Sequence, residues 1–214
     1  MKKIKVRLTL IEGMLGTSPA DPDVYGSFIG SNAPNAATLE EEIEALGVEE
    51  VAQKGRTIFP RTEDGRPFIY DYQIKGFFKD ACSMLNRLTV EEIDEKGKKV
   101  KKPRNESGKI KAFKKVIDGM IFPEPREIPI NFEGDIGDCQ RPLRAQTAQG
   151  ERVTLASSDE VPAGATMEFT VKCLDDAHIV AVKEWLDYGC LRGIGQWRNS
   201  GKGRFTWEEI TDGN

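Results

Sequence analysis

The 214-residue sequence predicts an α+β protein that forms one domain over residues 1–214. Two segments alternate apolar and polar residues, the pattern of half-buried strands. Two others repeat apolar residues at three- and four-residue spacing, the pattern of amphipathic helices. With the insertions set aside, the order is strand, helix, strands, strand, helix, strand. That βαββαβ order is typical of the ferredoxin-like fold, in which two helices pack on one face of an antiparallel sheet.

The first strand is predicted at 3–11, and a long connection follows it at about 12–72. The strand residues expected on the buried face are Ile4, Val6, Leu8 and Leu10. The connection holds a segment rich in Gly, Pro, Ser and Asn at 13–34, and then a short acidic helix at 38–47. A connection of this length favours a functional role, because long irregular segments are uncommon in compact domains.

The first amphipathic helix is predicted at 73–88, after two short apolar pieces that flank a turn at 63–67. Its apolar stripe consists of Ile74, Phe77, Phe78, Ala81, Leu85 and Leu88. A basic insertion follows at about 89–125. The two insertions therefore lie on either side of this helix.

The second half of the chain is predicted to be mostly strands. Short strands are expected at 126–132, 141–147 and 151–157, with a hairpin turn at Gln149–Gly150. A further strand alternates over 165–174, with Met167, Phe169, Val171 and Cys173 inward.

The second amphipathic helix is predicted at 178–188, and a last strand at 205–208. The apolar stripe of this helix consists of Ile179, Val182, Trp185 and Leu186. Because both helices carry one apolar stripe, we expect them to share a core in which Trp185 meets Phe77 or Phe78.

The charge of the chain is unevenly distributed. Residues 96–115 contain ten Lys or Arg and one acid, a local charge of +9, whereas the whole chain carries −4. Such a run is either a solvated loop or a contact for a polyanion such as RNA. Few apolar residues occur in it, so we expect the free segment to be mobile and to order on a partner.

The composition excludes several other functions. The four cysteines are widely spaced without a C-x-x-C pair, and there is one histidine, so neither a metal site nor a cofactor is expected. No segment has the apolar length of a membrane span and the start does not resemble a signal peptide. The chain is expected to be cytoplasmic.

A glycine-rich loop near the C-terminus is the most distinctive motif. Its glycines are Gly193, Gly195, Gly201 and Gly203, in the order G-x-G-x5-G-x-G. Its cations are Arg198, Lys202 and Arg204. Glycine lets backbone N–H groups approach a ligand closely, and Arg and Lys can reach phosphate oxygens, which predicts an anion-binding loop. The alternative is a plain turn.

Three further side chains are candidate RNA contacts. Trp197 in the loop could stack on a base or, equally, anchor the loop against the core. Lys75 and Lys79 lie one turn apart on the first helix and could meet one run of phosphates, or they could simply be solvent-exposed.

Three local motifs resemble the RAMP superfamily of CRISPR-associated RNA-binding proteins. The loop at 193–205 resembles its C-terminal glycine signature. Residues 67–79 are similar to its entry into the first helix, although Tyr-Asp-Tyr-Gln replaces the usual Pro-Gly-Ser-Ser. Residues 160–171 are similar to its E-x-V-P-x-G-T-x-F-x-F strand. The resemblance implies an RNA-binding backbone subunit that grips guide RNA, with other subunits or copies of itself as partners.

No catalytic residue is assigned from the sequence. A repeat-processing ribonuclease of this superfamily would have a histidine near the first helix, whereas His178 begins the second. An aspartate after the first strand would suit cleavage by a backbone subunit, and Asp21 and Asp23 lie there, but both read equally well as turn residues. Two alternatives stay open: a stand-alone phage or mobile-element protein that binds host or defence components, and a metal-assisted endoribonuclease.

Overall fold

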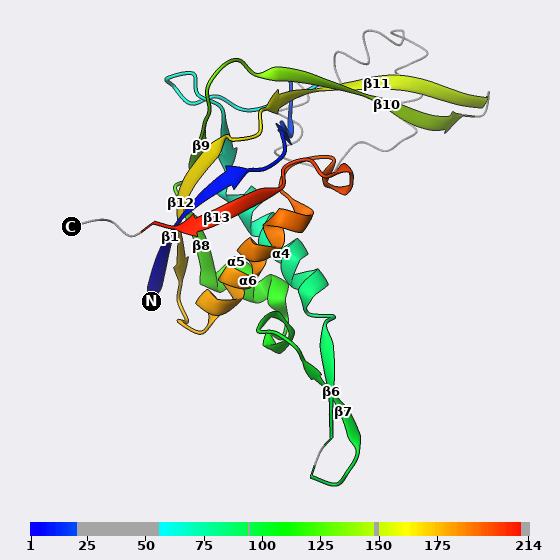
Figure 1. Ribbon diagram of the computed structural model, residues 1–214. Helices are drawn as coiled ribbons and strands as arrows, with labels where there is room; N and C mark the ends of the chain where they lie inside the picture. Colours follow the sequence, from blue (N-terminus) through cyan, green and yellow to red (C-terminus); the bar gives the residue numbers. More distant parts are fainter. Residues whose placement is uncertain (21–55, 94, 148–149, 211–214) are drawn as a thin grey trace.

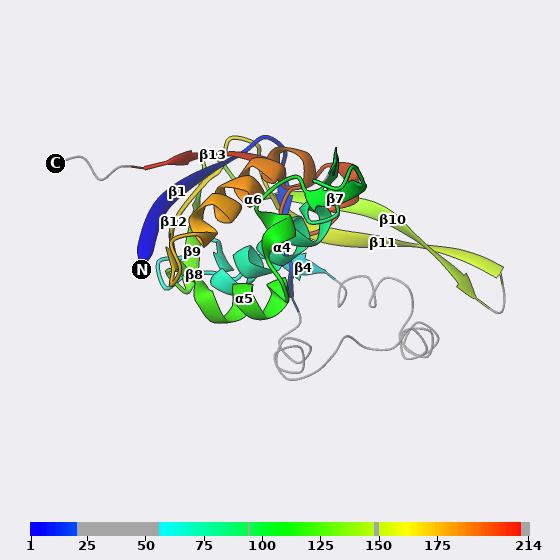
Figure 2. The ribbon, with the colours of Figure 1, turned by 90° about the horizontal axis from the view of Figure 1, so that it is seen from below.

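The computed structural model describes residues 1–20, 56–93, 95–147 and 150–210, with the side chains of 143–147 and 150–154 excepted. In this part of the chain the fold is a mixed α+β arrangement. Helices α4 (Asp71–Leu85), α5 (Phe113–Met120) and α6 (His178–Arg192) lie together on one side of a sheet (Figures 1 and 2).

The helices cover a six-stranded sheet in the order β13-β1-β12-β9-β5, with β8 also paired to β12. In chain order these strands are β1 (Lys2–Leu10), β5 (Phe68–Tyr70), β8 (Ile121–Glu124), β9 (Glu127–Asn131), β12 (Thr166–Cys173) and β13 (Phe205–Glu209). Every pairing in this sheet is antiparallel. Strands from both ends of the chain therefore meet, with β1 between β12 and β13.

The predicted alternation of β1 and β12 is confirmed. Ile4 faces Val171 and Val6 faces Phe169 across the antiparallel pair, and all four side chains are buried. The intervening residues point to the other face, where Arg7 pairs with Glu168 at 2.7 Å. One face of the sheet is thus apolar and lies under the helices, and the other is polar.

The two predicted helices pack in one core, as expected. Phe78 of α4 meets Trp185 of α6 with ring centroids 5.3 Å apart, and both side chains are fully buried. The helix limits differ from those predicted: α4 begins at Asp71 and ends at Leu85, and α6 continues to Arg192. The early start of α4 follows from Gln73, whose side-chain oxygen accepts the Tyr70 N–H at 2.9 Å.

A second sheet is built around a long hairpin, the ribbon, formed by β10 (Gly137–Thr147) and β11 (Gly150–Val161). The ribbon extends away from the helix-covered body (Figure 1). Three two-residue strands border its root: β2 (Met14–Leu15), β3 (Ser18–Pro19) and β4 (Thr57–Ile58). Both ribbon strands were predicted, but shorter. The predicted acidic helix at 38–47 and residue 149 of the hairpin turn lie outside the described residues.

The basic insertion, expected to be mobile over 96–115 in the free protein, has regular secondary structure in its described residues. They form a hairpin of β6 (Thr89–Ile93) and β7 (Lys99–Pro103), a 3-10 turn (Ser107–Lys109) and helix α5. The hairpin projects from the body (Figure 1), but the residues after it pack on the core. Ser107 and Ile117 are fully buried, so the insertion is anchored by one polar and one apolar side chain, which its composition did not predict.

Ser107 attaches the insertion to α6 through a buried polar network. The carboxylate of Glu184 accepts the N–H groups of Glu106 and Ser107 at 2.9 and 3.2 Å and the Ser107 hydroxyl at 3.0 Å. The indole N–H of Trp185 donates to the same hydroxyl at 2.9 Å. In this network the Ser107 hydroxyl, the Trp185 N–H and the Glu184 carboxylate therefore all have partners, as a buried network requires.

We expect Ser107→Ala to destabilise the protein by about 1–3 kcal/mol, because the Trp185 N–H loses its acceptor inside the core. Urea denaturation followed by tryptophan fluorescence measures this free energy of unfolding. The matched control is Glu106→Ala. Its side chain pairs with Lys109 at 2.5 Å at the surface, where ion pairs contribute about 0–1 kcal/mol. Equal losses in the two variants would contradict the role of the buried network.

Candidate nucleic-acid interface

The glycine-rich loop leaves the C-terminal end of α6 and returns to the sheet as β13. All four of its motif glycines have positive φ, between 71° at Gly203 and 92° at Gly201. This region favours glycine because a Cβ would meet neighbouring backbone atoms. The motif is therefore required by the conformation of the loop itself.

The two ends of the loop also approach each other too closely for side chains. A Cβ at Gly203 would lie 1.8 Å from the carbonyl oxygen of Ile194, and the Ile194 N–H donates to the Gly203 carbonyl at 2.9 Å. The Gly203 N–H in turn donates to the carbonyl of Gly13, at 2.9 Å, in the segment after β1. These backbone groups are engaged within the protein.

The predicted cations of the loop all have internal acidic partners. Arg198 lies 2.8 Å from Asp80 of α4, and Lys202 lies 2.5 Å from Glu160 of β11. The hydrogen bond with Glu160 raises the pKa of Lys202 and so favours its charged form. Arg204 makes a longer pair of 3.4 Å with Glu12. The cations join the loop to three other parts of the chain.

Lys75 and Lys79 are not brought to this loop. The Lys79 ammonium pairs with Asp118 of α5 at 2.6 Å, and that of Lys75 donates to the Asp118 carbonyl at 3.2 Å. The next residue, Asp80, faces the glycine loop instead. The two groups of predicted cations thus serve contacts to different elements.

Trp197 is a large apolar residue of the loop whose side chain is exposed. It is 43% exposed and stands outside the buried core. Its φ of 53° places it in the left-handed region, which is unusual for a bulky residue. The guanidinium of Arg141, on β10, lies over the indole ring at 5.6 Å from its centre. The alternative that Trp197 anchors the loop in the core is not supported by the structure.

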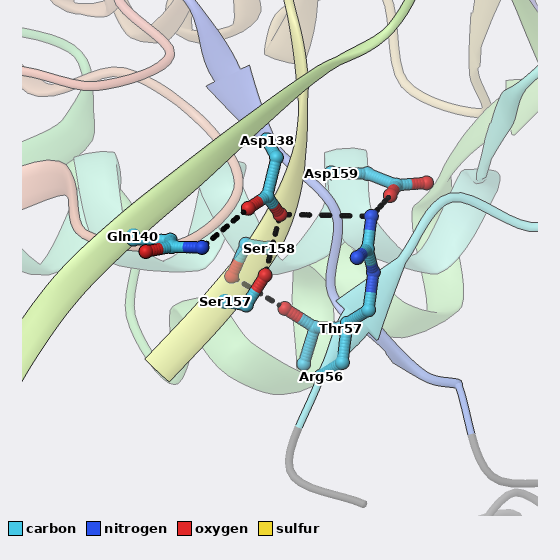
Figure 3. Close-up of polar contacts among 7 residues, drawn as sticks. All are labelled: Arg56, Thr57, Asp138, Gln140, Ser157, Ser158 and Asp159. Atoms are coloured by element: carbon cyan, nitrogen blue, oxygen red, sulfur yellow. Dashed lines mark hydrogen bonds and ion pairs between the residues drawn. The ribbon is translucent and has the colours of Figure 1, made fainter. Parts of the chain in front are cut away.

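The root of the ribbon is held on both faces. On one face, Gln196 of the glycine loop accepts a hydrogen bond from Arg141 at 2.8 Å and donates to the Gly16 carbonyl at 3.0 Å. On the other, Arg56 lies 3.0 Å from Asp159 and 3.5 Å from Asp138 (Figure 3). These two aspartates are direct partners in the β10–β11 register, where like charges repel, and the arginine neutralises them.

The polar contacts of Asp138 stabilise its charged form. Ser157 donates a hydrogen bond to one carboxylate oxygen and Gln140 donates to the other at 3.1 Å (Figure 3). Chiefly the Ser157 bond, with smaller effects of Gln140 and Arg56, lowers the pKa of Asp138 below its ordinary value. This cluster was not predictable from the sequence, because it depends on the β10–β11 register and on Arg56 from a distant segment.

Several cations without an internal partner lie in the basic insertion. Within the described residues, five of its cations form no ion pair or side-chain hydrogen bond: Lys101, Arg104, Lys111, Lys114 and Lys115. All five side chains are exposed. Lys99, Lys102 and Lys109 by contrast pair with neighbouring glutamates. We call these five residues the basic surface: Lys101 lies on β7, Arg104 just after it, Lys111 just before α5, and Lys114 and Lys115 in its first turn.

The remaining candidates for catalysis find little support in the geometry. His178 is the first residue of α6, as predicted, and its buried Nδ1 has no hydrogen-bond partner among the described residues. Asp21 and Asp23 lie outside the described residues. In the described parts of the chain, no three His, Cys, Asp or Glu side chains cluster as metal ligands would, and no helix is long and apolar enough to cross a membrane.

Comparisons with known proteins give a fold likeness only. No protein-family model matches the sequence, and no curated protein matches it. Solved structures do match, among them a chain of "Cryo-EM structure of the Type III-B Cmr-beta bound to cognate target RNA", with a TM-score of 0.48 and 13% identity. The match covers 98% of this chain but 58% of that chain, so this chain spans less than two thirds of its length. The similarity is weak and carries no argument about function.

We expect Gly203→Ala to destabilise the protein beyond the usual range of about 0.5–3 kcal/mol for single substitutions. The new Cβ would collide with the Ile194 carbonyl, which is fixed by the backbone on both sides. The matched control is Gly65→Ala, at a φ of 82° with open space around it, where only the left-handed conformation costs about 1–2 kcal/mol. Chemical denaturation of both variants separates the two causes. Similar losses would contradict the close approach.

We expect the lowered pKa of Asp138 to make stability depend on pH on the acid side. A depressed pKa in the folded state contributes stability above the ordinary carboxyl range, and this contribution is lost as the pH falls through the folded value. Asp138→Asn should therefore lose less stability between pH 7 and pH 3 than the wild type, in urea denaturation at each pH. Asp135→Asn is the control, because Asp135 has no bonded partner in the described structure. An unchanged pH profile for Asp138→Asn would contradict the inference.

Proposed function

We propose that this protein binds RNA through its phosphate backbone, using a ferredoxin-like core of the RAMP type as a support. The sheet places the first and third strands of the βαββαβ order, β1 and β12, side by side at its centre. The second and fourth, β9 and β13, flank them, and α4 and α6 share one core. This arrangement and the three sequence motifs together support the assignment to that fold.

The observation that carries the proposed function is the basic surface of the insertion. Its five unpaired cations are held on a folded support, because Ser107 and Ile117 are anchored in the core. The rest of the chain carries a net negative charge, so a polyanion is attracted to this surface more than to the chain as a whole. Lysine and arginine contacts to phosphates give affinity without reading sequence.

This mode of binding fits a subunit that grips guide RNA or another single strand within a ribonucleoprotein. Such a subunit needs backbone contacts rather than base-specific hydrogen bonds, and neighbouring subunits or copies of this chain would extend the binding surface. No catalytic role is part of the proposal.

The glycine loop and α4 supply secondary contacts in this proposal. RNA at Arg198, Lys202 or Arg204 would exchange an internal carboxylate for a phosphate, and the same holds for Lys79 at Asp118. The gain per contact is then smaller than at an unpaired lysine, because one ion pair is lost for each one formed. Gly193, Gly201 and Gly203 belong to this second group, because their N–H groups already donate to carbonyls within the protein. Gly195 and Lys75, whose ammonium donates to the Asp118 carbonyl, are also placed in it.

The internal pairing of these loop cations favours a second candidate, a stand-alone phage or mobile-element protein with a RAMP-like fold that binds host or defence components. In that case the basic surface would meet an acidic protein surface. Purified protein free of nucleic acid that also fails to bind added RNA would favour this candidate.

We expect the triple variant Lys111→Gln, Lys114→Gln, Lys115→Gln to bind single-stranded RNA more weakly and with a flatter salt dependence. If each lysine neutralises one phosphate, the slope of log K against log salt falls by about 2, at roughly 0.7 per contact on a single strand. Fluorescence anisotropy of a labelled oligonucleotide, titrated at several salt concentrations, measures both the affinity and the slope.

The control for this experiment is Lys2→Gln, Lys3→Gln, Lys183→Gln. It removes the same net charge from β1 and α6, outside the insertion. If both triple variants lose affinity equally, only the overall charge matters. If neither loses affinity, the basic surface does not bind RNA and the proposal fails.

A further inference from the structure

We propose that Trp197 and Arg141 form a stacking site for an unpaired nucleobase at the root of the ribbon. The inference rests on the proposed function and adds to it the class of ligand that this part of the surface accepts: single-stranded nucleic acid, as opposed to a duplex whose bases are already stacked. The site lies where the glycine loop meets β10, and this loop is far from the β6–β7 hairpin (Figure 1).

The first argument is the cost of keeping a tryptophan at this position. A left-handed backbone is unfavourable for a bulky residue, and the motif around Trp197 shows that glycine is the residue suited to such positions. Burial in the core would offset this cost, but the side chain is 43% exposed and contributes nothing to the core. The loop conformation thus presents an indole ring to solvent at the expense of stability.

The second argument is that the ring is held in a fixed orientation. Arg141 lies over it at 5.6 Å, and the arginine is itself fixed by the Gln196 side chain at 2.8 Å. Gln196 is anchored in turn to the Gly16 carbonyl at 3.0 Å. A ring that is both exposed and fixed loses little conformational entropy when it binds a flat ligand.

The third argument is the chemistry of the pair. The Nη1 atom of Arg141 is buried and has no hydrogen-bond partner among the described residues, so the guanidinium interacts with the indole through its face and not as a saturated donor. An indole next to a guanidinium plane is a surface on which nucleobases stack, because every base has a π-face and stacking tolerates any sequence. The same pair has no feature that would select a duplex.

The experiment compares two single-stranded oligonucleotides of equal length, one with bases and one abasic, by fluorescence anisotropy with Trp197→Ala and the wild type. Loss of one stacked base weakens binding by about 5- to 150-fold. Trp197→Ala should therefore bind the strand with bases more weakly than the wild type does, by a factor in that range. It should bind the abasic strand as the wild type does. Trp197→Phe, which keeps an aromatic ring, should retain most of the affinity.

The matched control is Tyr72→Ala on α4. Tyr72 is 47% exposed and has Arg126 over its ring at 5.4 Å, but it occupies a regular helix away from the loop. Its removal should leave the difference between the two strands unchanged. Trp197→Gly adds a stability test: it relieves the backbone strain, so its melting temperature should equal or exceed that of Trp197→Phe.

The outcomes separate the two proposals. If neither strand binds the wild type, RNA binding itself fails and the stacking site with it. If both strands bind but Trp197→Ala and the wild type bind the normal strand equally, or if Tyr72→Ala alone abolishes the preference for it, only the stacking site is overturned. A large loss of stability in Trp197→Gly would show that the ring serves packing and would overturn it as well.

Discussion

The close approach of Gly203 to the Ile194 carbonyl is the constraint on which the shape of the molecule depends. It closes the glycine-rich loop, and the closed loop then joins four parts of the chain: the end of α6, the segment after β1, helix α4 and the ribbon. The helix-covered sheet and the ribbon have separate hydrogen-bonding networks, so their relative position depends on such bridges. A side chain at Gly203 would open the loop and loosen all four.

Cations of the same kind serve two purposes in this protein. Those of the glycine loop and of α4 form ion pairs with internal carboxylates, which neutralise most of their charge. Those on the surface around Lys111 have no acid to neutralise and leave their charge available to a partner. Because a phosphate contact gains most where no internal pair is given up, the position of a cation relative to acids decides its use more than its place in a motif.

How far the candidate site could be predicted differs from residue to residue. The need for glycine at 193 and 203 was predictable, since the G-x-G-x5-G-x-G pattern indicates backbone that side chains would block. The ion pairs of Arg56 with Asp138 and Asp159 were not, because they depend on the register of the β10–β11 hairpin and on an arginine from a distant part of the chain. The contact of Arg141 with Trp197 was not predictable either, since it depends on the tertiary structure that places the guanidinium over the ring.

The sequence by itself determined the strands and helices of the core, because an alternating or 3.6-residue apolar pattern has only one way to bury its face, as Val6 and Phe78 illustrate. It did not determine that the basic insertion would fold. Its order depends on a few contacts, chiefly Ser107 with Glu184 and Trp185, which form only when α6 is already packed on the sheet. Local composition predicts conformation where burial is periodic. Where a segment is held by distant polar partners, only the tertiary structure supplies the free energy that orders it.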